Sequence, residues 1–76
     1  MIHEGRIVVD PEIRFGKPCI KGTRIAVSDI LNLIASGYSI EDIPKQYPGI
    51  TKEDIIAAIE FASQSMEHPA QIVSQL

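Results

Sequence analysis

The chain has 76 residues, of which 45% are hydrophobic and 22% are charged, and its formal net charge at pH 7 is −3. These values are typical of one folded domain, residues 1–76, and exclude the polar, strongly charged profile of a disordered chain. Because Cys19 is the only cysteine, an internal disulfide is also excluded, and a domain this small commonly relies on a second subunit instead. We therefore expect a homodimer.

The distribution of apolar and charged residues bears on location and partners. No apolar run approaches the ~18 residues of a membrane span, and the N-terminal residues lack the basic and apolar segments of a secretory signal. We expect a cytoplasmic protein with no membrane partner. Residues 1–25 hold five Lys or Arg against three Asp or Glu, a net +2, whereas residues 26–76 hold two against seven, a net −5. Any nucleic-acid surface is therefore expected near the N-terminal end.

The first predicted elements are short strands. Residues 7–9 form a β-branched run that Asp10-Pro11 closes, because proline fixes φ and has no N–H for a strand ladder. Residues 18–20 and 23–25 flank Lys21-Gly22, and this glycine can take the positive φ of a tight turn. The pattern predicts a small hairpin around that turn.

A helix is predicted next, from Asp29 to Ser36, with Ser28 as its N-cap and Gly37 as the left-handed residue after its end. The i, i+3, i+4, i+7 spacing of one buried face supports this prediction; the residues are Val27, Ile30, Leu31 and Ile34.

A second helix is predicted after Ser39, where residues 39–42 resemble a capping box and Ile40, Ile43 and Tyr47 share one face. Pro44 opposes a regular helix at this point, so the helix should be bent, 3₁₀-like or very short.

The longest helix is predicted to begin at Thr51 as N-cap, with Glu53 and Asp54 in its first turn, and to end at Pro69. Its apolar stripe comprises Ile55, Ile56, Ile59, Ala62 and Met66. The fold class is therefore mainly α: a short N-terminal β-hairpin region over residues 7–25, three helix-turn-helix-like helices over 28–67 and a C-terminal tail over 69–76.

Two stretches of the sequence resemble a known family. They are Asp10-Pro11-Glu12-Ile13 followed by the Gly-Lys-Pro and Gly-Thr-Arg elements of residues 16–25, and Gly37-Tyr38-Ser39 leading to the Tyr-Pro-Gly of residues 47–55. From Ile7 to Ala62 the chain resembles the domain of unknown function 433 family. The resemblance implies a hairpin followed by a helix-turn-helix-like unit, and the antitoxin half of a prokaryotic toxin–antitoxin pair whose toxin is a PIN-like nuclease. Pro44 departs from the family pattern.

No enzyme, cofactor or metal site is expected. Gly16-Lys17 lacks the remainder of a phosphate-binding loop, and His3, Cys19 and His68 are too widely separated to suggest a metal site or a nucleophile with its base. The sequence therefore favours a binding protein over an enzyme.

Candidate nucleic-acid-binding residues are the cations of the hairpin region together with one on the long helix: Arg14, Lys17, Lys21, Arg24 and Lys52. Arg24 has an alternative role, which is to pair with Asp29 or Asp42 and hold the hairpin against the helices. The acidic start of the long helix, Glu53 and Asp54, would repel phosphates and makes it a poor reader of DNA bases.

The expected function is that of an antitoxin-like protein that restrains a cognate toxin and, as a dimer or toxin complex, binds operator double-stranded DNA. The candidate partner-binding residues are Ile72, Val73 and Leu76, which could dock as one face of an amphipathic helix. The alternative is a protein-binding or dimerisation module that does not bind DNA.

Overall fold

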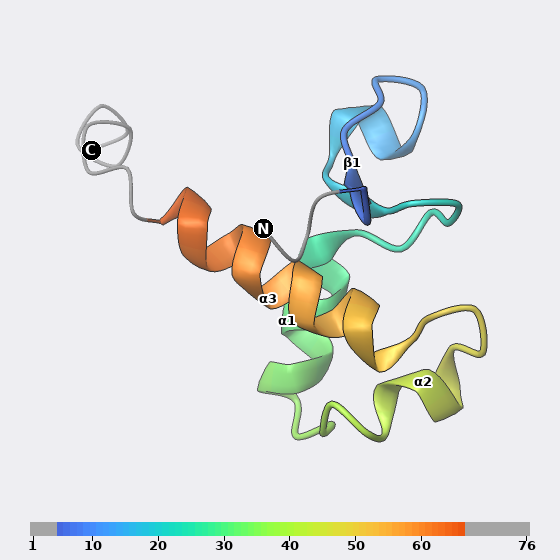
Figure 1. Cartoon of the computed structure of the whole chain (residues 1–76), viewed down its shortest axis with the longest axis vertical. Helices are drawn as coiled ribbons and strands as arrows, with labels where there is room; N and C mark the ends of the chain where they lie inside the picture. The colour runs from blue at the N-terminus through green and yellow to red at the C-terminus, as the bar shows by residue number, and fades with distance from the viewer. Residues whose placement is uncertain (1–4, 67–76) are drawn as a thin grey trace.

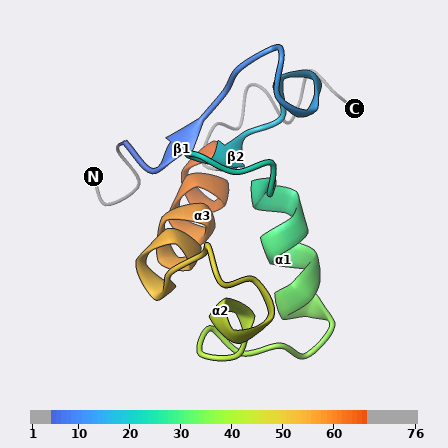
Figure 2. The ribbon, with the colours of Figure 1, turned by 90° about the vertical axis from the view of Figure 1, so that its right-hand side faces the viewer.

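A computed structural model describes residues 5–66 of the chain. Its elements, in chain order, are β1 (Ile7–Val8), the 3₁₀ turn η1 (Arg14–Gly16), β2 (Cys19–Ile20), α1 (Val27–Ala35), α2 (Ile43–Gln46) and α3 (Lys52–Ser65) (Figure 1). The predicted fold class is confirmed, since three helices follow a short two-stranded antiparallel hairpin. Figure 2 shows the hairpin at one end of the α1–α3 pair and α2 at the other. Among the described residues no helix has the length and apolar character needed to cross a membrane.

The hairpin differs in detail from the prediction. β2 pairs with β1, in a register that places Ile7 opposite Ile20 and Val8 opposite Cys19. Residues 23–25 form no strand; the Ile20 N–H donates to the Ile25 carbonyl at 2.9 Å around the expected turn, in which Gly22 has a φ of +81°. β2 therefore has contacts on both sides: it pairs as a strand with β1, and across the turn it forms a single antiparallel bridge between Cys19 and Ala26.

α1 begins two residues earlier than predicted. Its N-cap is Ala26, whose N–H donates to the Asp29 carboxylate at 3.0 Å, while Ser28 is exposed within the first turn. The predicted end is confirmed: Gly37 has a φ of +103°. The N–H groups of Gly37 and Tyr38 donate to the last carbonyls of the helix, which is the Schellman arrangement.

α2 is a single short turn of four residues, as Pro44 predicted. Residues 39–42 form a preceding turn, in which the Asp42 N–H donates to the Ser39 hydroxyl at 3.1 Å. Pro44 lies at the start of the helix, where its missing N–H leaves no helical hydrogen bond unmade. This explains how the proline is accommodated.

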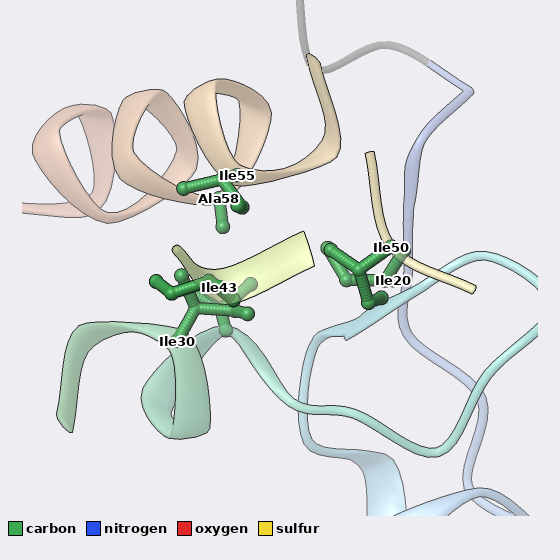
Figure 3. Close-up of a cluster of buried hydrophobic side chains, with 7 residues drawn as sticks. Ile20, Ile30, Ile43, Ile50, Ile55 and Ala58 are labelled. Atoms are coloured by element: carbon green, nitrogen blue, oxygen red, sulfur yellow. The ribbon is translucent and has the colours of Figure 1, made fainter. Parts of the chain in front are cut away.

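α3 begins at the predicted cap, and the Thr51 hydroxyl accepts from the Asp54 N–H at 3.1 Å. Its buried face is rotated from the predicted stripe: Ala57 and Ala58 are fully buried, whereas Met66 is 72% exposed because it lies beyond the last helical residue. Figure 3 shows Ala58 with the fully or almost fully buried isoleucines of the core, which come from the hairpin, all three helices and the α2–α3 loop: Ile20, Ile30, Ile43, Ile50 and Ile55.

Candidate functional site

The structure separates the N-terminal cations into those held by carboxylates and those exposed to solvent. Arg6 and Arg14 form ion pairs with Asp54 and Asp29, at 3.0 and 2.9 Å. Among the described residues, no ion pair involves Lys17, Lys21 or Arg24, and all three are exposed. Only the second group is therefore free to meet an anionic partner.

Arg14, and not Arg24, holds the hairpin region against the helices. Its Nη1 donates to the Arg24 carbonyl at 2.7 Å and to Asp29 Oδ2 at 2.9 Å. The alternative role of Arg24, a pairing with Asp29 or Asp42, is not what the structure has: Asp29 pairs with Arg14, and Asp42 lies 3.9 Å from Lys45. Arg14 thus joins η1 to the start of α1.

The hydrogen bonds that Asp29 accepts from Ala26 and Arg14 lower its pKa. The hydrogen bond from the Ala26 N–H is the largest cause, burial opposes it, and the Arg14 guanidinium adds to the lowering. The nearby charge of Lys17 acts in the same direction. Lys17 lies near the N-terminus of α1, because the carbonyl of the next residue, Pro18, accepts from the Val27 N–H at 2.8 Å.

Arg6 attaches the hairpin to α3, a contact that sequence reasoning missed. Its guanidinium donates to Asp54 Oδ1 at 3.0 Å, while Asp54 Oδ2 accepts the Thr51 N–H at 3.0 Å. Burial acts to raise the pKa of Asp54, but the hydrogen bonds from Thr51 and Arg6 outweigh it, and the pKa lies below its usual value. Asp54 is therefore a structural acid and not a free charge of the helix surface.

The five candidate nucleic-acid residues differ in what surrounds them. Arg14, Lys17 and Arg24 lie about the start of α1. Lys21 lies beside β1, with its N–H donating to the Arg6 carbonyl at 2.7 Å. Lys52 Nζ is 3.6 Å from Glu41 Oε2, and both side chains are exposed, so this pair is weak and readily screened.

Phe15 is a feature that sequence reasoning missed. It is 99% exposed and has a φ of +60°, between Arg14 at +53° and Gly16 at +86°. A left-handed conformation costs an L-residue roughly 1–2 kcal/mol, and a solvent-exposed ring recovers none of that by packing. The only sign of it in the sequence was that this aromatic residue belongs to no predicted strand and to no apolar face of a predicted helix.

An apolar groove lies beside η1, between the start of α1 and the last turns of α3. Its volume is about 540 Å³, and its lining includes Lys17, Pro18, Val27, Leu31, Ala62 and Met66. We refer to it as the α1–α3 groove. Leu31 and Met66 are 36% and 72% exposed, which makes this an accessible apolar surface.

The described residues contain no group of three or more His, Cys, Asp or Glu side chains that could hold a metal ion. Cys19 is buried, with its Sγ 3.2 Å from the Lys17 carbonyl. The predicted partner-binding residues, Ile72, Val73 and Leu76, lie outside the residues that the structure describes.

Comparison with known proteins identifies relatives whose names state no activity. Residues 7–62 match the family described as a protein of unknown function, DUF433. A relative from Sinorhizobium fredii, the uncharacterized protein y4eO, is 32% identical over 56 residues, which cover 74% of this chain and 25% of the relative. The chain therefore spans about a quarter of that protein's length.

Two crystal structures share the fold. A DUF433 member from Anabaena variabilis is 29% identical with a TM-score of 0.76, and the match covers 95% of this chain and 68% of that one. The protein Rv2018 from Mycobacterium tuberculosis is 24% identical with a TM-score of 0.65, over 76% of this chain and 27% of that one. The second match supports the fold alone.

Replacing Asp54 with Asn should lower the free energy of unfolding at pH 7 by about 1–2 kcal/mol, because a charged cap and a partly buried ion pair are lost. Since the pKa of Asp54 is lowered on folding, its contribution is complete above the unfolded value of 3.8 and is lost as the pH falls through the folded value. Urea titrations at pH 7 and at about pH 3 should therefore show the difference between the two proteins shrinking at acid pH. The exposed neighbour supplies the control: Glu53→Gln should change stability by less than about 0.5 kcal/mol. Equal losses for both variants would contradict this assignment.

Replacing Phe15 with Gly should leave the free energy of unfolding of the monomer unchanged or raise it by up to about 1 kcal/mol. The relief of left-handed strain slightly exceeds the backbone entropy that glycine adds. Gly16→Ala is the opposite control and should destabilise, because Gly16 has a φ of +86°. A marked loss of stability in Phe15→Gly, measured by urea denaturation under monomeric conditions, would show that the ring packs within its own chain.

Proposed function

Because the chain belongs to the DUF433 family, whose description leaves function open, its role has to be inferred from its own surface, and we propose that it is an antitoxin-like protein. In this role it binds and restrains a cognate PIN-like nuclease toxin. The observation that carries the proposal is the electrostatic character of α3 at its N-terminus. The helix in the recognition position opens with an exposed Glu53 and a structurally fixed Asp54.

That arrangement suits a protein partner better than DNA. Lys52 is the only cation of α3, and Glu53 and Asp54 follow it directly, so the start of the helix offers no net positive charge to phosphates. An acidic face is instead complementary to the basic surface by which a nuclease holds its nucleic-acid substrate. The exposed acids of this face are Glu41, Asp42 and Glu53.

The C-terminal residues Ile72, Val73 and Leu76 add apolar anchors to the proposed complex. An apolar stripe of this spacing can enter a groove on the partner as one face of a helix. The acidic residues just before α2 and at the start of α3 would then set orientation and association rate, and the apolar anchors would slow dissociation.

The test is co-expression with the protein encoded by the neighbouring gene, followed by calorimetric titration of the purified pair. Reversing two exposed acids, Glu41→Lys with Glu53→Lys, should weaken binding at least about tenfold, since close interfacial charge pairs contribute roughly 1.5 kcal/mol or more. A separate variant, Ile72→Asp with Val73→Asp, should weaken binding more than the charge reversals do.

The matched control is Glu12→Lys with Asp10→Lys, which reverses two exposed acids of the hairpin region and should leave binding almost unchanged. A neighbour that does not bind the wild-type chain, or that binds all three variants equally well, would contradict the proposal.

Operator DNA is a second candidate ligand, supported by the exposed cations Lys17, Lys21 and Arg24. Arg14 does not belong to this set, because its guanidinium holds Asp29 and the Arg24 carbonyl. Lys17 precedes β2, and Lys21 and Arg24 lie on the turn that follows it. Contacts from such loop side chains would be mainly to phosphates, and base readout would be minor.

Changing Lys17, Lys21 and Arg24 together to Ala should reduce the slope of log affinity against log salt by up to roughly three per protomer, at ~0.9 for each phosphate contact. Fluorescence anisotropy with upstream operon DNA at several salt concentrations measures this slope. Lys45→Ala removes a cation that lies 3.9 Å from Asp42 and should have little effect. If the wild type and its toxin complex do not bind DNA even at low salt, the protein functions through protein binding alone.

A further inference from the structure

The η1 turn, which several hydrogen bonds and an ion pair fix in place, exposes the aromatic ring of Phe15 to solvent. Phe15 is 99% exposed, and the turn beneath it is closed by hydrogen bonds from Gly16 N–H to the Ile13 carbonyl and from Lys17 N–H to the Arg14 carbonyl. Arg14 anchors the turn to α1 through Asp29 at 2.9 Å. A strained conformation that survives without local packing gain is characteristic of a functional position.

The α1–α3 groove is large enough to receive such a ring. Its volume is about 540 Å³, whereas a cavity of about 150 Å³ lined by aliphatic side chains already binds benzene. Pro18, Val27 and Leu31 supply apolar walls. The groove thus offers Phe15 a complementary environment, but within one chain the ring lies in solvent.

Ring and groove lie in the same part of the surface. Lys17 and Pro18 line the groove and follow Phe15 by two and three residues, so the Cα atoms of Phe15 and Lys17 are at most about 7.6 Å apart. A two-fold axis through this part of the surface brings the ring of each copy against the groove of its partner. A projection beside a groove is the self-complementary arrangement that such an interface requires.

The charges around Phe15 also favour a second copy of the chain. Glu12 lies three residues before the ring and Lys17 two residues after it, and both are exposed. A two-fold arrangement can place the acid of one copy near the base of the other. A nucleic acid would meet Glu12 and Asp10 as repulsive charges.

From these observations we infer that Phe15 of each copy inserts into the α1–α3 groove of the other, which forms a symmetric homodimer. The inference concerns self-association and is independent of the toxin partner. It accounts for the strained turn, because burial of the ring on association would offset the free energy that the left-handed backbone costs the isolated chain. A central buried aromatic side chain is also the usual anchor of an interface.

Sedimentation equilibrium of the full chain across the micromolar range tests this dimer. The wild type should show the mass of two protomers. Phe15→Gly, which removes the ring, and Leu31→Lys, which places a charge in the groove, should each raise the dimer dissociation constant at least about 30-fold. Circular dichroism and a urea midpoint of each variant show that it remains folded.

An equimolar mixture of the two variants gives the sharpest result. A mixed dimer pairs the intact groove of Phe15→Gly with the intact ring of Leu31→Lys, so one of two contacts is restored and the mixture should associate more tightly than either variant alone. Val9→Ala, which truncates another apolar side chain that is 61% exposed, should dimerise as the wild type does.

Several outcomes would overturn the inference. A monomeric wild type, a dimer unaffected by Phe15→Gly, or a mixture no tighter than its components would each remove the reciprocal contact. If the double variant Ile72→Asp with Val73→Asp is monomeric and Phe15→Gly still dimerises, the C-terminal segment of the partner, and not Phe15, occupies the groove. Loss of DNA affinity in Phe15→Gly without a change of mass would assign the ring to a nucleic acid.

Discussion

The architecture depends on one interaction that occurs twice, a carboxylate at the third position of a helix that binds both the helix cap and an arginine from the hairpin region. Asp29 accepts from the Ala26 N–H and from Arg14. Asp54 accepts from the Thr51 N–H and from Arg6. Each aspartate favours helix initiation and also attaches the N-terminal segment to that helix. A two-stranded hairpin is marginally stable by itself, so these contacts, with the buried Ile20, hold it in place.

The exposure of Phe15 follows from the same interaction. Arg14 has to reach both Asp29 and the Arg24 carbonyl, and the backbone at residues 14–16 turns with three successive positive φ values. The Arg14 guanidinium contacts the start of α1, and the ring of the next residue lies in solvent. The contact that anchors the N-terminal segment thus also determines which apolar side chain the protein presents to a partner.

Local signals in the sequence predicted the helices better than the contacts between them. Gly37, Pro44 and Thr51 act on the backbone within one turn, and the end of α1, the shortness of α2 and the start of α3 were predicted from them. The cap of α1 was not, because Ala26 has no side-chain oxygen and only the returning Asp29 bond marks the position. The partner of β2 and the choice of Arg14 over Arg24 depend on contacts between residues 11 to 15 positions apart, which short-range patterns do not encode.

The paired arginines also change how the charge of the chain should be interpreted. By sequence, residues 1–25 carry a net positive charge, but Arg6 and Arg14 are compensated by Asp54 and Asp29. The exposed cations Lys17, Lys21 and Arg24 are then opposed nearby by the exposed acids Asp10 and Glu12. Interspersed charges cancel beyond roughly one Debye length, about 8 Å at physiological salt, so this surface exerts little long-range attraction on DNA. Short-range contacts therefore have the larger part in selecting partners. They would be made by the exposed Phe15 ring, the α1–α3 groove and the acidic start of α3.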